Sequence, residues 1–283
     1  MKSYTIKSYA KVNVGLQILN KRPDGYHNIK TVFQELDFYD TIELKKKDNG
    51  CEFHSNVNWL RNDSTNLCVL AFEKFSEEYD VGGISINLVK QIPSGGGLGG
   101  GSSNAAAILK GLCHLYSIEP IYEKLSKIAL RLGADVPFFL KGGMQIASGI
   151  GEQLVEMSGR INGVYLLVIP KFKIDTKWAY KSMKKFLDRP KVEVNFANLL
   201  KRDKTPFRLF ENDFESIVIP AYPEIATIKE KLWSRRPKFV SLSGSGSTVF
   251  GIFDDEAEAK SAESLFSHRY STFIANPVTH MLK

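Results

Sequence analysis

The stretch PSGGGLGGGSSNAAAIL, residues 93–109, places six glycines in the seven positions from Gly95 to Gly101. Ordering so many glycines costs much conformational entropy, and glycines have no side chains whose packing would offset this loss. Binding of a ligand that needs close backbone approach and several N–H donors would offset it, and phosphate is such a ligand. The stretch therefore predicts a phosphate-binding loop.

The residues around this loop predict a strand before it and a helix after it. We expect the strand in GISINLVKQI, residues 83–92, and the start of the helix at Ser102 or Ser103. A strand, a glycine loop and a helix in this order direct helical N–H groups and the positive end of the helix dipole toward an anion. The apolar face of the predicted helix consists of Ala105, Ile108, Leu109, Leu112, Leu115 and Tyr116.

Other glycine-rich loops fit these residues less well. The loop matches the dinucleotide fingerprint, but Glu119, at the spacing of the ribose-binding acid, follows a helix and not a strand. The loop has no Walker A lysine, and the chain has neither the HRD nor the DFG sequence of protein kinases. A flexible linker seldom lies between a strand and an amphipathic helix. A phosphate loop of another type remains.

Length and composition are those of an ordinary globular protein. The 283 residues, 43% of them hydrophobic and 24% charged, suffice for one large domain or two ordinary ones. The N-terminal residues contain no apolar signal segment, and the run VYLLVI at 164–169 is too short to span a bilayer. Cys51, Cys68 and Cys113 form no CxxC pair. We therefore expect a cytoplasmic protein with reduced cysteines and no membrane partner.

The formal net charge of +7 permits a nucleic-acid partner, because basic surfaces bind phosphates without sequence preference. The basic residues are scattered, however, and short clusters such as Lys45–Lys47 and Lys184–Lys185 are typical of a solvated surface. A polyanionic small molecule would be attracted equally well. Charge alone leaves both partner classes open.

Strand-like and helix-like segments are mixed along the first part of the chain. YTIKSYAKVNVGLQIL, KTVFQELDF and DTIEL indicate three antiparallel strands, with the turn signal RPDGYH among them. A helix is expected over 64–75 with Ser64 or Thr65 as its N-cap, and another over 121–133 that ends at Gly133. The glycine-rich segment 142–164 is expected to be irregular and to contain a domain boundary near residue 160.

The remainder alternates strands and helices, which predicts a small α+β sandwich. The predicted strands are VYLLVI, KFVSLS, TVFGIF and YSTFIA. The predicted helices are TKWAYKSMKKFL at 176–187, YPEIATIKEKLW at 222–233 and DEAEAKSAESLF at 255–266.

Three segments resemble motifs of the GHMP kinases. PSGGGLGGGSSNAA resembles their second motif, and SLSGSGSTVF at 241–250 resembles their third. The segment AKVNVGLQILNKRPDGYHNIKTVFQELDFYDTIEL at 10–44 resembles one branch, the 4-diphosphocytidyl-2-C-methyl-D-erythritol kinases, and KRPDGYH is specific to that branch. Val14 stands where the branch often has leucine, which affects packing only.

The resemblance covers essentially the whole chain and implies an α+β, two-domain GHMP kinase fold. Residues 1–159 would form an ATP-binding domain like ribosomal protein S5 domain 2, and residues 160–283 a ferredoxin-like substrate domain. The implied activity moves the γ-phosphoryl group of ATP to the 2-hydroxyl of 4-diphosphocytidyl-2-C-methyl-D-erythritol in non-mevalonate isoprenoid synthesis, with Mg²⁺ as the second cofactor.

Phosphoryl transfer to an alcohol needs a carboxylate that takes the proton and cations that hold the developing charge. By resemblance, Asp135 in GADVPFFL matches the catalytic base and Lys11 the active-site lysine. Taken alone, Asp135 fits a helix cap and Lys11 an edge residue of a strand. Asn13 shares the face of Lys11 by the period of two and is expected to contact the substrate.

The resemblance also assigns the nucleotide-binding residues. Asn66 would lie near the adenine, although an asparagine at this position is as readily a helix cap. A magnesium ligand is not evident beyond Ser102 or Ser103, and phosphate and water oxygens are expected to hold most of the ion. The predicted ATP-binding residues are Asn66, Lys90, Pro93, Ser94, Gly95, Gly96, Gly97, Leu98, Gly99, Gly100, Gly101, Ser102 and Ser103.

A cytidine diphosphate group needs a site that stacks on a pyrimidine and bonds its polar edge. Tyr26 and His27 follow a turn, and Thr176 and Tyr180 lie one helical turn apart. The counterparts of these residues in the family surround the cytosine, so we expect a sandwich between Tyr26 and Tyr180. A core role for Tyr180 is the alternative.

Two other function classes remain open from the sequence. A homoserine or mevalonate kinase would share the glycine loop but lack the PDGYH segment. A nucleic-acid-binding protein would have no use for Lys11 and Asp135 beside an ATP loop, although the N-terminal domain shares its core with a ribosomal-protein fold. We expect a small-molecule substrate, no nucleic acid, and a monomer or homodimer.

Overall fold

The computed structural model describes residues 3–183 and 192–279. Two strands at the N-terminus are unusually long, β1 (Ser3–Lys21) and β2 (His27–Lys47), and each contributes to both of two compact units. The domain division at 159/160 stays a prediction. The first unit takes its described residues from Met1–Ala10, Tyr39–Ser94 and Gly99–Lys141, and the second from Lys11–Phe38, Gly95–Leu98 and Gly142–Lys283.

Strand β2 pairs with β1 through the turn at 22–26, where Arg22 N donates to Tyr26 O at 2.8 Å. The two strands expected in KTVFQELDF and DTIEL are in fact this single strand. No glycine or proline separates them, and the alternation of buried side chains continues through Leu36, Ile42 and Leu44.

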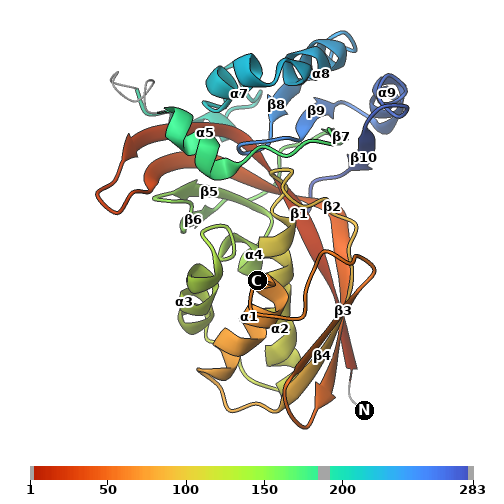
Figure 1. Cartoon of the computed structure of the whole chain (residues 1–283). Coiled ribbons are helices and arrows are strands. Elements are labelled where there is room, and N and C mark those ends of the chain that lie inside the picture. The colour runs from red at the N-terminus through yellow and green to blue at the C-terminus, as the bar shows by residue number, and fades with distance from the viewer. Residues whose placement is uncertain (1–2, 184–191, 280–283) are drawn as a thin grey trace. The chain divides into compact units, whose positions relative to one another are not determined.

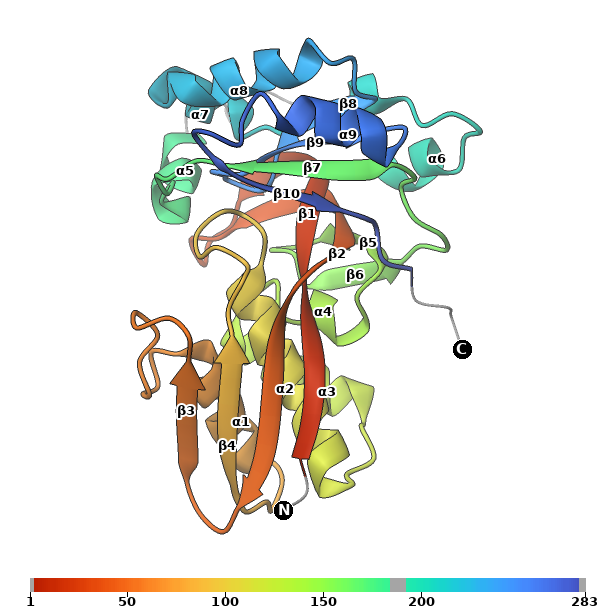
Figure 2. The same cartoon turned by 90° about the vertical axis from the view of Figure 1, so that its right-hand side faces the viewer.

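In the first unit, helices cover one side of a sheet. Strand β3 (Cys51–Ser55) pairs in parallel with β4 (Gly83–Val89), which pairs antiparallel with 41–47 of β2. Figure 2 shows β3 and β4 side by side with the first-unit part of β2. Strand β3 was not expected from the sequence. The helices α1 to α4 lie on one side of β3 and β4 (Figure 1): α1 (Leu67–Ser76), α2 (Gly100–Tyr116), α3 (Tyr122–Leu132) and α4 (Phe138–Lys141).

The caps of α1 and α2 differ from those expected. The N-cap of α1 is not Ser64 or Thr65 but Asn66, which confirms the cap role given above as an alternative for Asn66; its Oδ1 accepts a hydrogen bond from Cys68 N at 3.0 Å. Helix α2 begins at Gly100, two or three residues earlier than expected, and its N-cap is Gly99 with φ of 69°. No side chain caps α2, because the glycine loop runs directly into the helix.

In the second unit, the segment expected to be irregular contains a hairpin. Strands β5 (Met144–Ser148) and β6 (Gln153–Glu156) pair with each other, and β5 also pairs antiparallel with 31–34 of β2. The glycines that suggested irregularity all lie outside the two strands: Gly149 and Gly151 occupy the turn, with φ of 67° and 116°, and the others precede or follow the hairpin. Met144 and Ile146 of β5 and Leu154 and Val155 of β6 are apolar residues suited to strands.

The second unit also contains a four-stranded antiparallel sheet in the order β10-β7-β9-β8. The first of these strands along the chain, β7, lies beside the fourth, β10, and the second, β8, lies beside the third, β9, as in a ferredoxin-like sandwich. The expected strands are confirmed. Their bounds are β7 (Val164–Ile169), β8 (Phe239–Leu242), β9 (Val249–Phe253) and β10 (Ser271–Ala275).

Helices α7 (Glu215–Ala221), α8 (Pro223–Trp233) and α9 (Glu256–Glu263) lie on one face of this sheet (Figure 1). The expected helix 176–187 is observed as α5 (Thr176–Ser182), and residues 184–187 lie outside the described residues. Helices α6 (Phe196–Leu200) and α7 were not predicted.

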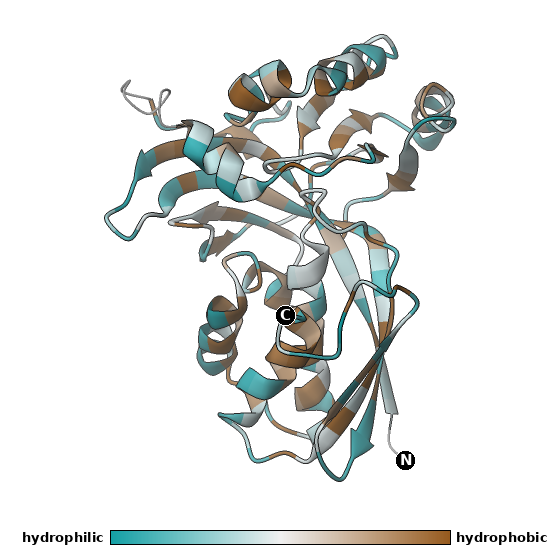
Figure 3. Ribbon diagram, in the orientation of Figure 1, coloured by the Kyte–Doolittle hydropathy of each residue, from teal (hydrophilic) through white to brown (hydrophobic). Residues whose placement is uncertain are grey.

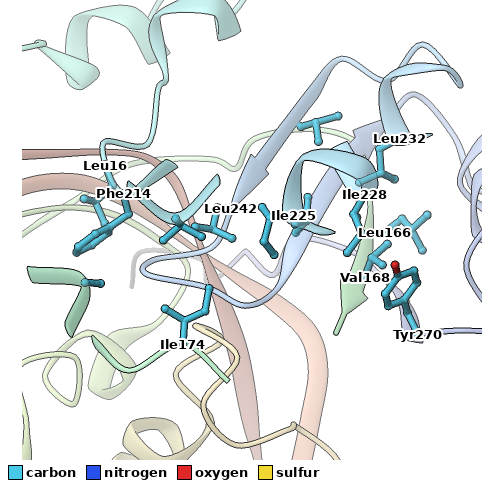
Figure 4. Close-up of a cluster of buried hydrophobic side chains, with 14 of the residues drawn as sticks. Leu16, Leu166, Val168, Ile174, Phe214, Ile225, Ile228, Leu232, Leu242 and Tyr270 are labelled. Carbon is cyan, nitrogen blue, oxygen red and sulfur yellow. The ribbon is translucent and has the colours of Figure 1, made fainter. Parts of the chain in front are cut away.

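A continuous hydrophobic core joins these helices to the sheet and to β1. Figure 4 shows Leu166 and Val168 of β7 near Ile225 and Ile228 of α8, and Leu16 of β1 beside Phe214. In Figure 3, polar and apolar residues alternate along α3, as expected for a helix with one buried face. Among the described residues, no helix is both long and apolar enough to cross a membrane.

Candidate active site

Lys11 and Asn13 project from the same face of β1, as their spacing predicts. Lys11 Nζ donates to Asn13 Oδ1 at 2.6 Å, and Asn13 Nδ2 donates to Thr31 Oγ1 at 3.0 Å. The Thr31 hydroxyl in turn donates to Gly15 O at 2.6 Å. Only 3% of Lys11 is exposed, so it is not a solvated edge residue. A lysine buried in this way is held in one orientation by its neighbours.

The first half of the glycine loop lies against the segment 243–248 in the second unit. Ser243 Oγ donates to Gly97 O at 2.8 Å, and Thr248 N donates to Gly96 O at 3.2 Å. A Cβ on Gly97 would overlap Ser243 O, and a Cβ on Gly96 would lie 2.9 Å from Thr248 Oγ1. Gly97 therefore needs glycine because its backbone packs against the backbone of Ser243, and Gly96 because the side-chain hydroxyl of Thr248 lies beside it.

The same loop also contacts the residues around Lys11. Lys11 N donates to Leu98 O at 3.0 Å. A Cβ on Gly244 would lie 3.3 Å from Asn13 Oδ1 and 3.9 Å from Gly97 Cα. The first, second and third motifs of the sequence thus meet within the second unit.

Positive φ recurs along the whole glycine loop up to the start of α2. Gly95, Gly97 and Gly99 have φ of 78°, 78° and 69°, and such alternation of positive φ is typical of loops whose N–H groups converge on an anion. The first turn of α2 contains no acidic residue that would oppose an anion at its positive end. A Cβ on Gly100 would lie 2.9 Å from Lys90 Nζ, so this ammonium lies beside the start of the helix.

Lys90 forms an ion pair with Asp40 in the first unit, and their side chains are only 6% and 0% exposed. Lys90 Nζ also donates to Asn104 Oδ1 at 3.1 Å. From the sequence, Lys90 was predicted to bind ATP, and no role was predicted for Asp40 or Asn104. The available signal was the position of Asp40 between Phe38 and Ile42, where the alternation of the strand predicts a buried apolar residue.

Asn66 and Asp135 both lie in the first unit. Both polar groups of Asn66 bond to the backbone, since Oδ1 caps α1 and Nδ2 donates to Arg61 O at 2.9 Å. A role near the adenine stays a prediction. Asp135 lies partly buried in the turn between α3 and α4, and the fully buried side chains of Val136 and Phe138 anchor that turn. Lys11 belongs to the second unit, and its pairing with Asp135 stays a prediction.

Two of the residues expected around cytosine, His27 and Tyr180, contact each other in the second unit. The rings of His27 and Tyr180 stack with centroids 5.1 Å apart, and the rings of Tyr180 and Phe214 are nearly perpendicular with centroids 4.9 Å apart. Tyr26 is 60% exposed. Burial, and then the charge of Lys21, lower the pKa of His27 below its ordinary 6.5. His27 is therefore neutral at neutral pH and offers one donor and one acceptor.

Thr176 and Tyr180 lie on α5 as expected but have different neighbours. The hydroxyl of Thr176 hydrogen-bonds to Ser245 Oγ at 3.0 Å, which connects α5 to the third motif. Tyr180 packs against the hydrophobic core, in agreement with the core alternative. A place for either residue at the cytosine stays a prediction.

Asn212 holds the third motif in place and was missed by sequence analysis. Its Nδ2 donates to Leu242 O at 2.7 Å and to Gly244 O at 2.9 Å. Its Oδ1 accepts from Phe214 N at 3.0 Å. No local pattern could reveal this role, because the partner carbonyls lie about thirty residues further along the chain.

Comparison with known proteins supports the motif assignments. Residues 66–143 match the GHMP kinases N terminal domain, and residues 195–271 match the GHMP kinases C terminal domain. The 4-diphosphocytidyl-2-C-methyl-D-erythritol kinase of Chlorobaculum tepidum is 40% identical over 275 residues, which cover 95% of this chain and 96% of that protein.

Solved structures agree. A crystal structure of 4-(cytidine 5'-diphospho)-2C-methyl-D-erythritol kinase matches with a TM-score of 0.85 and 28% identity, covering 98% of this chain and all of the other. Homoserine kinase from Cytophaga hutchinsonii, at 18% identity and a TM-score of 0.75 over 99% of this chain and 96% of that one, shows the shared fold alone. With both GHMP domains matched and 40% identity across nearly the whole length, the chain belongs to the 4-diphosphocytidyl-2-C-methyl-D-erythritol kinase family of the GHMP kinases.

Proposed function

We propose that this protein transfers the γ-phosphoryl group of ATP to the 2-hydroxyl of 4-diphosphocytidyl-2-C-methyl-D-erythritol, a step of non-mevalonate isoprenoid precursor synthesis. The observation that carries the proposal is the 40% identity over 95% of the chain to a kinase named for this substrate. The meeting of three motifs around Lys11 supplies its physical basis.

The glycine loop, from Pro93 to Ser103, is proposed to bind the phosphates of ATP. Its alternating positive φ values and the unopposed positive end of α2 support this role. Lys90, which pairs with Asp40 and lies beside the first turn of α2, is proposed to contact ATP through its ammonium group. Asn66 is proposed to lie near the adenine.

Asp135 is proposed as the catalytic base. It would take the proton of the 2-hydroxyl while that oxygen bonds to the γ-phosphorus and the bond to ADP breaks. Its place in a turn anchored by buried side chains supports a carboxylate of fixed orientation. Lys11, held by Asn13, is proposed to orient the hydroxyl and to balance charge that develops on the transferred group.

Tyr26 and Tyr180 are proposed to stack on the two faces of the cytosine, with His27 and Thr176 beside it. A neutral imidazole offers both a donor and an acceptor to the polar edge of the base, and the phenol ring offers a stacking surface. The high exposure of Tyr26 leaves its ring available to a ligand.

Mg²⁺ is proposed as the second cofactor, and it would neutralise the β- and γ-phosphate oxygens of ATP. Across residues 3–183 and 192–279, His, Cys, Asp and Glu side chains form no group of three suited to a metal. This donor set fits an ion held mainly by phosphate and water oxygens. Ser102, which is partly exposed, suits a single protein ligand better than Ser103, whose Oγ accepts from Ser8 Oγ at 2.8 Å.

The remaining assignments follow from this activity. We propose a cytoplasmic enzyme that acts on a small molecule, as a monomer or homodimer, without a nucleic-acid or membrane partner.

The proposal is tested by incubating the protein with ATP and Mg²⁺ and, separately, the cytidyl substrate, homoserine or mevalonate. Mass spectrometry should detect a phosphorylated product, with matching ADP release, from the cytidyl substrate alone. Phosphorylation of homoserine or mevalonate in its place would contradict the assignment.

A further inference from the structure

One buried carboxylate binds both ends of the glycine loop. Asp40 Oδ1 accepts hydrogen bonds from the backbone N–H groups of Gln91 at 2.7 Å and Ile92 at 2.8 Å, immediately before the loop. Asp40 Oδ2 accepts from Asn104 Nδ2 at 2.8 Å, immediately after it. The residues between these attachment points, 93–103, are the loop itself.

Side chains of the first unit extend this network to the end of the loop. Lys90 pairs with Asp40 and donates to Asn104 Oδ1, so the carboxylate accepts from four donors and its buried charge is compensated. Asn104 Nδ2 also donates to Ser8 Oγ at 2.9 Å, and the Ser8 hydroxyl donates to Ser103 Oγ at 2.8 Å. These hydrogen bonds lie at the two ends of the glycine loop.

A glycine-rich loop needs such a restraint more than other loops do. Each of its six glycines has wide backbone freedom, and the entropy lost when a nucleotide orders them would be subtracted from the binding free energy. Fixing both ends in advance removes many of the loop conformations that do not bind.

We propose that Asp40 is a positioning residue for ATP, and that its carboxylate clasps the base of the glycine loop so that the loop is ordered before the nucleotide binds. The proposal rests on the proposed function, because it takes the phosphates of ATP as the ligand of the loop. The Asp40 side chain is fully buried, so the proposed effect on ATP acts through the loop.

Asp40→Asn tests the clasp with little change in size. The amide still accepts from Gln91 and Ile92, but its NH₂ group faces the donors of Lys90 and Asn104. We expect the dissociation constant for ATP, measured by calorimetry, to rise about tenfold or more. The KM of the second substrate should stay unchanged, and deuterium exchange of 93–103 without nucleotide should become faster. If Asp40 only stabilised the fold, Asp40→Asn would lower the stability of the protein but would not weaken ATP binding more than binding of the second substrate.

Asn104→Ala opens the other end of the clasp while the Asp40–Lys90 pair remains, so it serves if Asp40→Asn does not fold. The proposed restraint needs hydrogen bonds at both ends of the loop, so losing either end removes it. The dissociation constant for ATP of the Asp40→Asn/Asn104→Ala double variant should therefore be no higher than that of the single variant with the greater loss. Glu35→Gln is the matched control. It removes an equally buried carboxylate of β2 that accepts from Gly143 N at 2.8 Å, and it should leave ATP affinity unchanged.

Wild-type ATP affinity in both Asp40→Asn and Asn104→Ala would overturn the clasp, as would equal weakening by Glu35→Gln or additive effects in the double variant. A wild-type protein that binds no ATP would instead refute the proposed function, so the two failures are distinguishable.

Discussion

Replacing Gly97 by alanine should reduce both stability and turnover far more than replacing Gly50 by alanine, although both glycines have a left-handed backbone. Their φ values are 78° and 72°. A Cβ on Gly50 would have no heavy atom within 4 Å. A Cβ on Gly97 would overlap Ser243 O and lie 3.0 Å from Ser243 C, both atoms of the backbone.

The difference in cost follows from these two environments. Left-handed backbone costs an L-residue about 1–2 kcal/mol, and Gly50→Ala should lose about that much. Gly97→Ala adds the cost of overpacking, about 1–3 kcal/mol, so it should lose about 2–5 kcal/mol in total. The Ser243 carbonyl must also move by on the order of 1 Å, and a displacement of that size near reacting groups can reduce turnover about a hundredfold.

Thermal unfolding and steady-state kinetics would test this prediction. Gly97→Ala should show the larger drop in melting temperature together with a strong loss of turnover, and Gly50→Ala a small drop with normal turnover. Equal effects of the two substitutions on both measurements would refute the argument that the two loops pack backbone to backbone.

Three further predictions concern single residues of the candidate site. Asp135→Asn should cut turnover about a hundredfold to ten-thousandfold while ATP affinity measured by calorimetry persists, and near-normal turnover would remove Asp135 from the mechanism. CMP, but not UMP, should raise the melting temperature, and Tyr180→Ala should abolish that protection and raise the KM of the cytidyl substrate alone; equal protection by CMP and UMP would contradict the cytosine site. Because burial and Lys21 lower the pKa of His27 below 6.5, the unfolded chain binds more protons in that range, so the free energy of unfolding should fall as the pH drops below about 6.5. His27→Gln should flatten this fall in thermal melts, and an identical pH profile would show that His27 does not cause it.

Local patterns determined much of the architecture. The glycine loop with its helix, the four strands of the second-unit sheet and the turn at 22–26 depend on the periodicity and turn chemistry of neighbouring residues, so they could be predicted. The family, and with it Lys11, Asn13 and the third motif, could be inferred because GHMP motifs are short contiguous segments. Where local signals were ambiguous, the prediction was wrong. The hairpin at 144–156 was expected to be irregular because the segment around it is rich in glycine.

Only the tertiary structure decided which groups hold these motifs in place. Asp40 reaches Asn104 across 64 positions of the chain, and Asn212 reaches Gly244 across 32. The stacking of His27 on Tyr180 likewise joins segments far apart in sequence. Such contacts leave no periodic signal, because a buried polar side chain is stabilised by whichever partners the fold brings to it. The sequence by itself therefore determined the candidate groups for chemistry, and the tertiary structure decided how they are oriented and restrained.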